Sequence, residues 1–196
     1  MRSDARRNRE RVLAAAEEVL ATEGMSASMR AVAERAGVGL GTIYRHFPTQ
    51  EALYLEIVLD WRRRLLTDAV DLSTAPDAGV AFFAFATRMV ERTTRMKALV
   101  LAIAQVDGTP DAVPALAGSP DAAAEDARLR GETRAAMEVL LTRAQDAGAV
   151  RADLRLAELL ALLNAACLAA AHIGWTDDLR ERALAVMFDG FRPRPA

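Results

Sequence analysis

The chain has 196 residues, of which 52% are hydrophobic and 27% charged, which excludes a largely disordered protein. Its single cysteine, Cys167, excludes an internal disulfide and a zinc site built from cysteines, and it fits a reducing compartment. The net charge of −2 excludes the broad basic surface of a nonspecific nucleic-acid binder, although five arginines before Val12 form a small basic arm.

Helical periodicity runs through the chain, and no alternating strand pattern of useful length appears. The sequence therefore predicts an all-α protein of about nine helices. The predicted ranges are 6–23, 29–36, 40–47, 49–66 or beyond, 77–94, 95–106, 121–147, 154–173 and 178–190. The proline- and glycine-rich stretch 108–120 is expected to be a loop.

Two short helices joined by a tight turn form the most informative part of the pattern. Ser28 can cap the first of them, and Gly37 can end it in a left-handed conformation. The second helix stops before Pro48. This arrangement is what a helix-turn-helix requires, because its second helix must be free to enter a major groove.

Within 40–47, Ile43 and Phe47 are spaced to face the core. The other face offers groups that can contact phosphates and bases. They belong to Thr42, Tyr44, Arg45 and His46. Gly41 costs a helix about 1 kcal/mol relative to alanine, which a close approach to DNA would explain. The alternative is that 37–47 only connects two core helices.

The run Gly37-Val-Gly-Leu-Gly-Thr-Ile-Tyr-Arg-His-Phe-Pro-Thr-Gln-Glu-Ala-Leu-Tyr54 resembles the recognition-helix signature of the tetracycline-repressor (TetR) family. The similarity extends upstream through 29–36 and covers about residues 6–65, with the motif itself at 28–47. It implies an N-terminal DNA-binding domain over 1–49 and a C-terminal domain for regulation, ligand binding and dimerisation over 50–196.

By this resemblance, residues 39–42 approach base edges, Tyr44 and His46 bind phosphates, and the start of the second helix holds the DNA backbone. The predicted contacts to double-stranded operator DNA are Ser28, Arg30, Gly39, Leu40, Gly41, Thr42, Tyr44, Arg45, His46 and Gln50. Two positions depart from the usual pattern. Gln50 can donate a hydrogen bond to phosphate but brings no charge, and Leu40 faces either a thymine methyl group or the core.

The resemblance also implies a cavity for a small, largely apolar effector among the middle helices. The predicted lining is Phe82, Phe85, Met89, Ile103, Met137 and Leu141, with Asn164, Cys167 and His172 as polar contacts. Plain core packing is the alternative for the apolar members, as packing or redox sensing is for Cys167. No metal or cofactor is expected. Arg62-Arg63-Arg64 either is a solvated face or meets DNA or acids of the second domain.

The last two predicted helices are rich in leucine, and alanines among them allow close helix contact, so they predict a homodimer. The apolar run 156–171 is interrupted by Glu158 and Asn164 and is interpreted as a buried helix rather than a membrane span. Together these features predict a cytoplasmic, ligand-responsive repressor on an inverted-repeat operator. An enzyme is not expected, and a helical adaptor with degenerate DNA binding is the alternative function.

Overall fold

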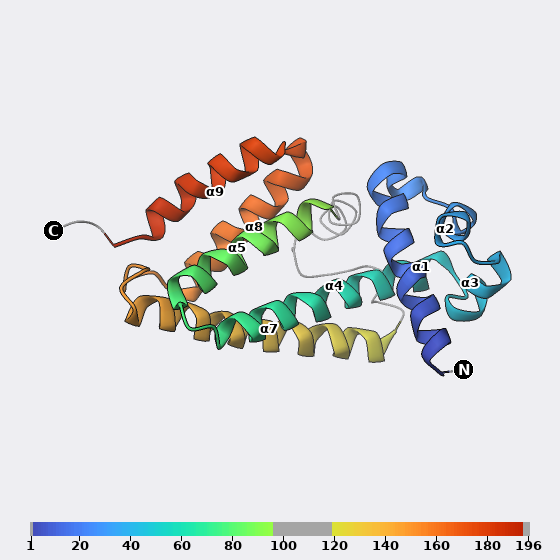
Figure 1. The fold of residues 1–196 in the computed structure, drawn as a ribbon, viewed down its shortest axis with the longest axis horizontal. Helices are drawn as coiled ribbons and strands as arrows, with labels where there is room; N and C mark the ends of the chain where they lie inside the picture. The colour runs from blue at the N-terminus through green and yellow to red at the C-terminus, as the bar shows by residue number, and fades with distance from the viewer. Residues whose placement is uncertain (1, 96–118, 194–196) are drawn as a thin grey trace. The chain divides into compact units, whose positions relative to one another are not determined.

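A computed structural model describes residues 2–95 and 119–193 (Figure 1). The chain divides into two compact units. One contains residues up to Trp61 together with Arg95–Glu125, and the other contains Arg62–Thr94 and Asp126–Ala196. The first turns of the fourth helix thus belong to the N-terminal unit, whereas the predicted second domain begins at residue 50.

The described residues contain helices and no strand, which confirms the all-α prediction. The α-helices are α1 (Arg2–Glu23), α2 (Met29–Ala36), α3 (Leu40–His46), α4 (Gln50–Ser73), α5 (Ala78–Arg95), α7 (Pro120–Asp146), α8 (Leu156–Ala169) and α9 (Asp177–Phe191). A short 3-10 turn (Gly24–Ser26) follows α1, and a π-helical turn (Ala170–Gly174) follows α8. The predicted helix over 95–106 lies almost wholly outside the described residues.

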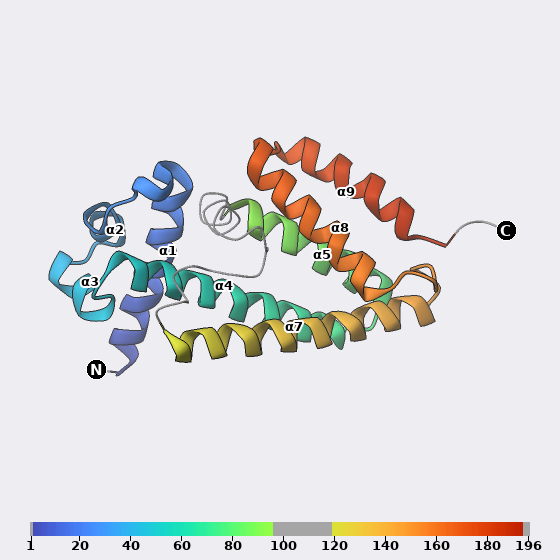
Figure 2. The ribbon, with the colours of Figure 1, turned by 180° about the vertical axis from the view of Figure 1, so that it is seen from behind.

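The core of the N-terminal unit is built where helical periodicity placed it. The buried side chains of α1 include Val12, Leu13, Ala16, Val19 and Leu20, all at most 4% exposed. α2 and α3 lie beside this helix in both ribbon views (Figures 1 and 2). Ile43 and Phe47 close the core from the α3 side at 0% and 4% exposed, as predicted.

The turn between α2 and α3 depends on one glycine. Gly37 adopts φ +64°, a left-handed conformation that side chains disfavour. Its N–H donates to the Glu34 carbonyl oxygen at 3.2 Å, and the Val38 N–H donates to Ala33 at 3.1 Å. These bonds satisfy carbonyl groups at the end of α2 and reverse the chain into α3.

In the second unit, α5 contacts helices on several sides. The Phe82 ring packs edge-on against Phe191 of α9, with centroids 6.4 Å apart. On another side, Arg92 forms an ion pair with Asp68 of α4 at 2.8 Å. Because α5 uses both apolar and charged contacts, it holds the C-terminal part of α4 and the last helix in one unit.

α8 is buried on one face only. Leu159, Leu163 and Cys167 recur at four-residue spacing and are buried, whereas Leu162 and Leu168 are 45% and 42% exposed. Over 156–174 the apolar stretch is only 28% buried, so interpreting it as a buried helix is correct for one side and wrong for the other. Its length and composition would also suit a membrane span, a test that core helices of soluble proteins pass as well.

Candidate nucleic-acid interface

The outer face of α3 presents the polar groups that the sequence singled out. Tyr44 is 48% exposed, and Arg45 and His46 are also exposed, while Thr42 is half-buried. The Arg45 Nε donates to the Gly41 carbonyl oxygen at 3.2 Å, which folds this side chain back along its own helix. The last turn of α3 therefore offers a phenol, a guanidinium and an imidazole to solvent.

Leu40 begins α3 and is 39% exposed. This exposure removes the alternative that Leu40 belongs to the core with Ile43 and Phe47. An apolar side chain here can contact a thymine methyl group but cannot hydrogen-bond to a base edge.

Gly41 lies on the same exposed part of α3. A Cβ atom built at this residue would meet nothing within 4 Å apart from its neighbours and its own helix backbone. The fold therefore tolerates a larger residue at position 41, and the glycine is not explained by packing within the chain.

The start of α2 is a second exposed surface in this unit. The Ser28 hydroxyl oxygen accepts a hydrogen bond from the Ala31 N–H at 3.1 Å, which confirms the predicted cap. Arg30 is 82% exposed at its side chain and forms a 3.4 Å ion pair with Glu34 on the same helix. Such an exposed pair contributes little to stability, so Arg30 can exchange this partner for a phosphate at small cost.

α2 is held at both ends by side chains from other helices. At its C-terminal end, Arg11 Nη2 donates to the Ala36 carbonyl oxygen at 2.6 Å. At its N-terminal end, Gln50 Nε2 donates to the Ala27 carbonyl oxygen at 2.7 Å and also contacts the Tyr54 hydroxyl. The predicted hydrogen bond from Gln50 to phosphate thus needs revision, because its N–H groups are already directed to these partners.

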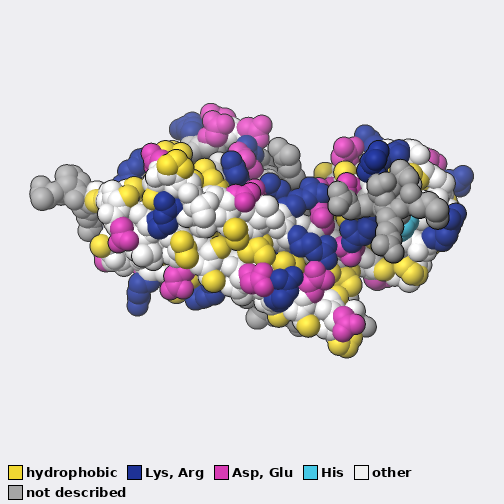
Figure 3. Space-filling model, turned by 60° about the horizontal axis from the view of Figure 1, so that its bottom comes forward, with side chains coloured by type: hydrophobic (Ala, Val, Ile, Leu, Met, Phe, Trp, Pro, Cys, Tyr) yellow, Lys and Arg dark blue, Asp and Glu magenta, His cyan; other side chains and the backbone are white. Residues whose placement is uncertain are grey.

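The predicted basic arm also changes in character. Arg9 forms an ion pair with Glu56, and Arg11 is bound to Ala36, so two of its arginines act within the unit. Arginine side chains nevertheless appear on the surface of the N-terminal unit, together with a histidine (Figure 3). α3 itself carries Arg45 and His46 and no acidic residue, which suits a polyanionic partner.

The predicted effector contacts divide by burial. The buried members are Phe82, Phe85, Met89, Met137, Leu141 and Cys167, all at most 7% exposed. Asn164 and His172 are exposed instead, and Ile103 lies outside the described residues. Burial raises the pKa of the Cys167 thiol to about 11, although a hydrogen bond with Thr93 opposes the shift. A redox-sensing role for Cys167 is disfavoured, because reactive thiols have lowered pKa values and are accessible.

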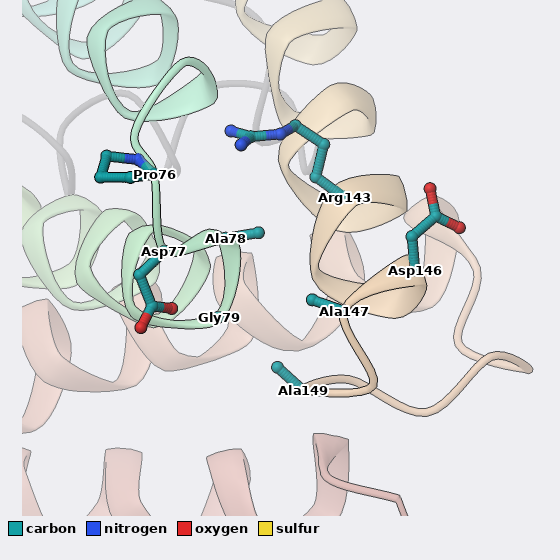
Figure 4. Close-up of a pocket in the computed structure, with 8 residues that line it drawn as sticks. All are labelled: Pro76, Asp77, Ala78, Gly79, Arg143, Asp146, Ala147 and Ala149. Carbon is teal, nitrogen blue, oxygen red and sulfur yellow. The ribbon is translucent and has the colours of Figure 1, made fainter.

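Among the described residues of the C-terminal unit, one groove lies beside the start of α5 and another beside the start of α8, and none of the predicted effector contacts lines either of them. The first, about 850 Å³, lies between the start of α5 and the end of α7 (Figure 4). Arg143 lines it, and its guanidinium donates to the carbonyl oxygens of Ser73 and Ala75, the latter at 2.8 Å. This arginine holds the turn after α4. We therefore interpret the groove as part of the contact between α5 and α7.

The second groove measures about 530 Å³ and lies between the start of α8 and the end of α9. Leu162 and Val186 line it and are 45% and 75% exposed. It therefore belongs to the exposed apolar face of these two helices.

A capped short helix, a left-handed glycine turn and an exposed polar second helix together define a helix-turn-helix protein. A family model described as bacterial regulatory proteins of the tetR family matches residues 12–57. Another, described as an SbtR-like transcriptional regulator C-terminal domain, matches residues 77–193. The chain belongs to the TetR family of bacterial transcriptional regulators, as the sequence motif indicated.

Individual proteins similar to this chain support the same family. The crystal structure of a TetR transcription regulatory protein from Mycobacterium vanbaalenii is 36% identical, with a TM-score of 0.71 over 98% of this chain and 99% of that one. A TetR transcriptional regulator from Streptomyces coelicolor is 29% identical, with a TM-score of 0.69 over 95% and 99%. The HTH-type transcriptional regulator UidR of Escherichia coli K12 is 39% identical over 67 residues, so the match spans 34% of either chain.

Proposed function

We propose that this protein is a cytoplasmic transcriptional repressor that binds an inverted-repeat operator as a homodimer and is released by a small apolar effector. The exposed polar face of α3 carries the proposal, because Tyr44, Arg45 and His46 face solvent while Ile43 is fully buried. Such a face has hydrogen-bonding groups for DNA and an apolar back that fixes its position.

In the proposed complex, Tyr44 and His46 hold phosphates and Thr42 reads base edges, with Arg45 as a further reader. Gly39, Leu40 and Gly41 form the part of α3 that comes nearest to the bases. Ser28 and Arg30 bind the backbone from the start of α2. The open space around Gly41 supports this arrangement, because a glycine that packing does not require is useful where DNA approaches closely.

The homodimer is proposed from the outer faces of α8 and α9. Five of the ten exposed large hydrophobic side chains among the described residues lie between residues 156 and 191: Leu162, Leu168, Ile173, Leu179 and Val186. A second copy is the occupant that we propose, since a two-fold dimer covers the same apolar face on both chains. Two-fold symmetry would also present two copies of α3 to the two half-sites of a palindrome.

The effector is proposed to enter the C-terminal unit near Phe85, Met89, Met137 and Leu141, whose side chains are apolar and buried. Its binding would favour a conformation with lower operator affinity. A coupling free energy of about 1–3 kcal/mol, or about 5–150-fold in affinity, is sufficient for such a switch.

Selection from a pool of random-sequence duplexes tests the proposed function. The protein should enrich an inverted repeat, and Tyr44→Ala and His46→Ala should weaken binding to all sequences alike, whereas Thr42→Ala should change the preferred sequence. Failure to enrich any sequence at moderate salt would contradict operator binding and favour the helical adaptor.

Gly41→Ala gives a sharper variant of this test. The free protein should become more stable by up to about 1 kcal/mol, because alanine is the better helix former and the site is open. Binding to the selected duplex should weaken if DNA approaches this residue. Unchanged binding would remove Gly41 from the interface, and Gly131→Ala, an equally open glycine in α7, serves as the control.

A further inference from the structure

Gln50 is the first residue of α4, yet its side chain points back to the segment before α2. Its Nε2 lies 2.7 Å from the Ala27 carbonyl oxygen and also contacts the Tyr54 hydroxyl one turn further along α4. Tyr54 in turn directs its hydroxyl to the same carbonyl at 3.4 Å. Ala27 itself is 3% exposed, so its carbonyl depends on these donors.

The orientation of the Gln50 amide follows from this chemistry. A backbone carbonyl only accepts hydrogen bonds, so the amide nitrogen, and not the amide oxygen, must face Ala27. The nitrogen has two hydrogens, and the Ala27 carbonyl and the Tyr54 hydroxyl take one each. Gln50 therefore has no remaining N–H group to donate to a phosphate in this conformation.

Ala27 directly precedes the cap of α2. Its φ of −51° and ψ of 123° lead the chain into Ser28, whose hydroxyl caps the helix. The exposed Arg30 is the second residue of α2. A shift of the Ala27 carbonyl would thus move the start of α2, which the proposed function assigns to the DNA backbone.

We propose that Gln50 is a positioning residue for DNA binding, which acts with Tyr54 through the Ala27 carbonyl and does not contact DNA itself. This inference rests on the proposed function. Gln50 and Tyr54 tie the start of α2 to α4, and Arg11 ties its end to α1. The position of Ser28 and Arg30 relative to α3 is then set before DNA arrives, which lowers the entropy that binding would otherwise cost.

The experiment compares Gln50→Ala, Tyr54→Phe and the double variant with Gln145→Ala. Gln145 is a matched control because it also donates from Nε2 to backbone carbonyls, those of Arg151 and Leu154 at 3.0 and 2.8 Å, but in the C-terminal unit. Hydrogen exchange of the Ala31 amide is measured in the free protein. Affinity and phosphate-ethylation interference are measured with the duplex that the wild-type chain selects.

Gln50→Ala should accelerate Ala31 exchange about tenfold and weaken binding about tenfold, the loss expected for one buried hydrogen-bonded carbonyl. Interference should fade at phosphates contacted from α2 and persist at those contacted from α3. Tyr54→Phe should act in the same direction but less, and the double variant should bind at least as weakly as Gln50→Ala, because it removes both donors to the Ala27 carbonyl. Gln145→Ala should leave both measurements unchanged.

Weaker binding of Gln50→Ala with unchanged Ala31 exchange would overturn the proposal in favour of a direct phosphate contact. Faster exchange with unchanged affinity and unchanged interference would overturn it in favour of a purely structural role. A wild-type chain that selects no duplex would instead contradict the proposed function, and the positioning role with it.

Discussion

Arg11 of α1 donates a hydrogen bond from Nη2 to the backbone carbonyl oxygen of Ala36, the last residue of α2, across 25 positions of sequence at 2.6 Å. The neighbouring Gly37 makes room for it, since a Cβ atom there would lie 3.2 Å from the same nitrogen. An arginine at this end of α2 also interacts favourably with the negative end of the helix dipole. One side chain thus fixes the turn that leads into α3.

Arg11→Ala should lower the free energy of unfolding by about 1–2 kcal/mol, because it removes a charge-assisted hydrogen bond to a helix end. Urea denaturation followed by circular dichroism measures the change. Arg7→Ala is the control, since it removes the same charge one turn earlier from an exposed position. Equal losses in the two variants would show that net charge, and not the bond to Ala36, is responsible.

Asp126 is 1% exposed and lies between two arginines, with Arg62 Nε at 2.9 Å from Oδ1 and Arg130 Nε at 2.9 Å from Oδ2. Asp126→Asn should destabilise the fold by about 1–3 kcal/mol, because it removes the buried carboxylate charge that pairs with two partly exposed guanidinium groups. Glu132→Gln, in an exposed pair with Arg128, should cost less than about 0.5 kcal/mol. Urea denaturation of both variants measures the change in the free energy of unfolding. Similar small losses in the two variants would contradict a stabilising role for Asp126.

Gly79 and Gly131 should respond oppositely to alanine. A Cβ atom at Gly79 would lie 2.6 Å from the Ala149 Cβ, so Gly79→Ala should destabilise the fold by about 1–3 kcal/mol through overpacking. At Gly131 nothing lies within 4 Å, and Gly131→Ala should stabilise α7 by about 0.5–1 kcal/mol. Thermal unfolding measures both changes, and a stabilising Gly79→Ala would refute the close contact.

Cys167 makes stability depend on alkaline pH. Burial raises its pKa from the ordinary 9.0 to about 11, so the native state keeps a proton that the unfolded chain releases between these values. This contribution is complete below pH 9 and is lost as pH rises toward 11, at up to about 1.4 kcal/mol per unit. The free energy of unfolding should therefore fall more steeply above pH 9 in the wild-type chain than in Cys167→Ala. If the free energy of unfolding depends on pH in the same way in both chains, the raised pKa of Cys167 is contradicted.

Substitutions on the outer faces of α8 and α9 test the proposed dimer interface. Leu162→Glu and Val186→Glu should each raise the dimer dissociation constant by at least about 100-fold, because a carboxylate would be buried in an apolar interface. Sedimentation measures the assembly state. Val80→Glu is the matched control, since Val80 is 66% exposed but lies on α5. Dimers that survive both α8 and α9 substitutions, or a Val80→Glu chain that also dissociates, would move the interface elsewhere.

Local signals in the sequence were sufficient for the helices and for the motif. The cap at Ser28, the left-handed Gly37 and the buried pair Ile43 and Phe47 each depend on neighbours within a few residues, so pattern and spacing predict them. The four-residue spacing of Gln50 and Tyr54 was also visible, and it could have suggested that the two side chains meet.

The tertiary structure was needed to show which hydrogen-bond partner each polar side chain takes. Whether Arg11 extends to DNA or caps Ala36, and whether Gln50 faces a phosphate or Ala27, depends on residues 25 and 23 positions away. The same holds for the exposed side of Leu40 and for the half-covered α8. Sequence by itself determined an all-helical member of the TetR family with its helix-turn-helix in place. Only packing between distant segments decided which hydrogen-bond donors are already taken and which apolar faces stay open.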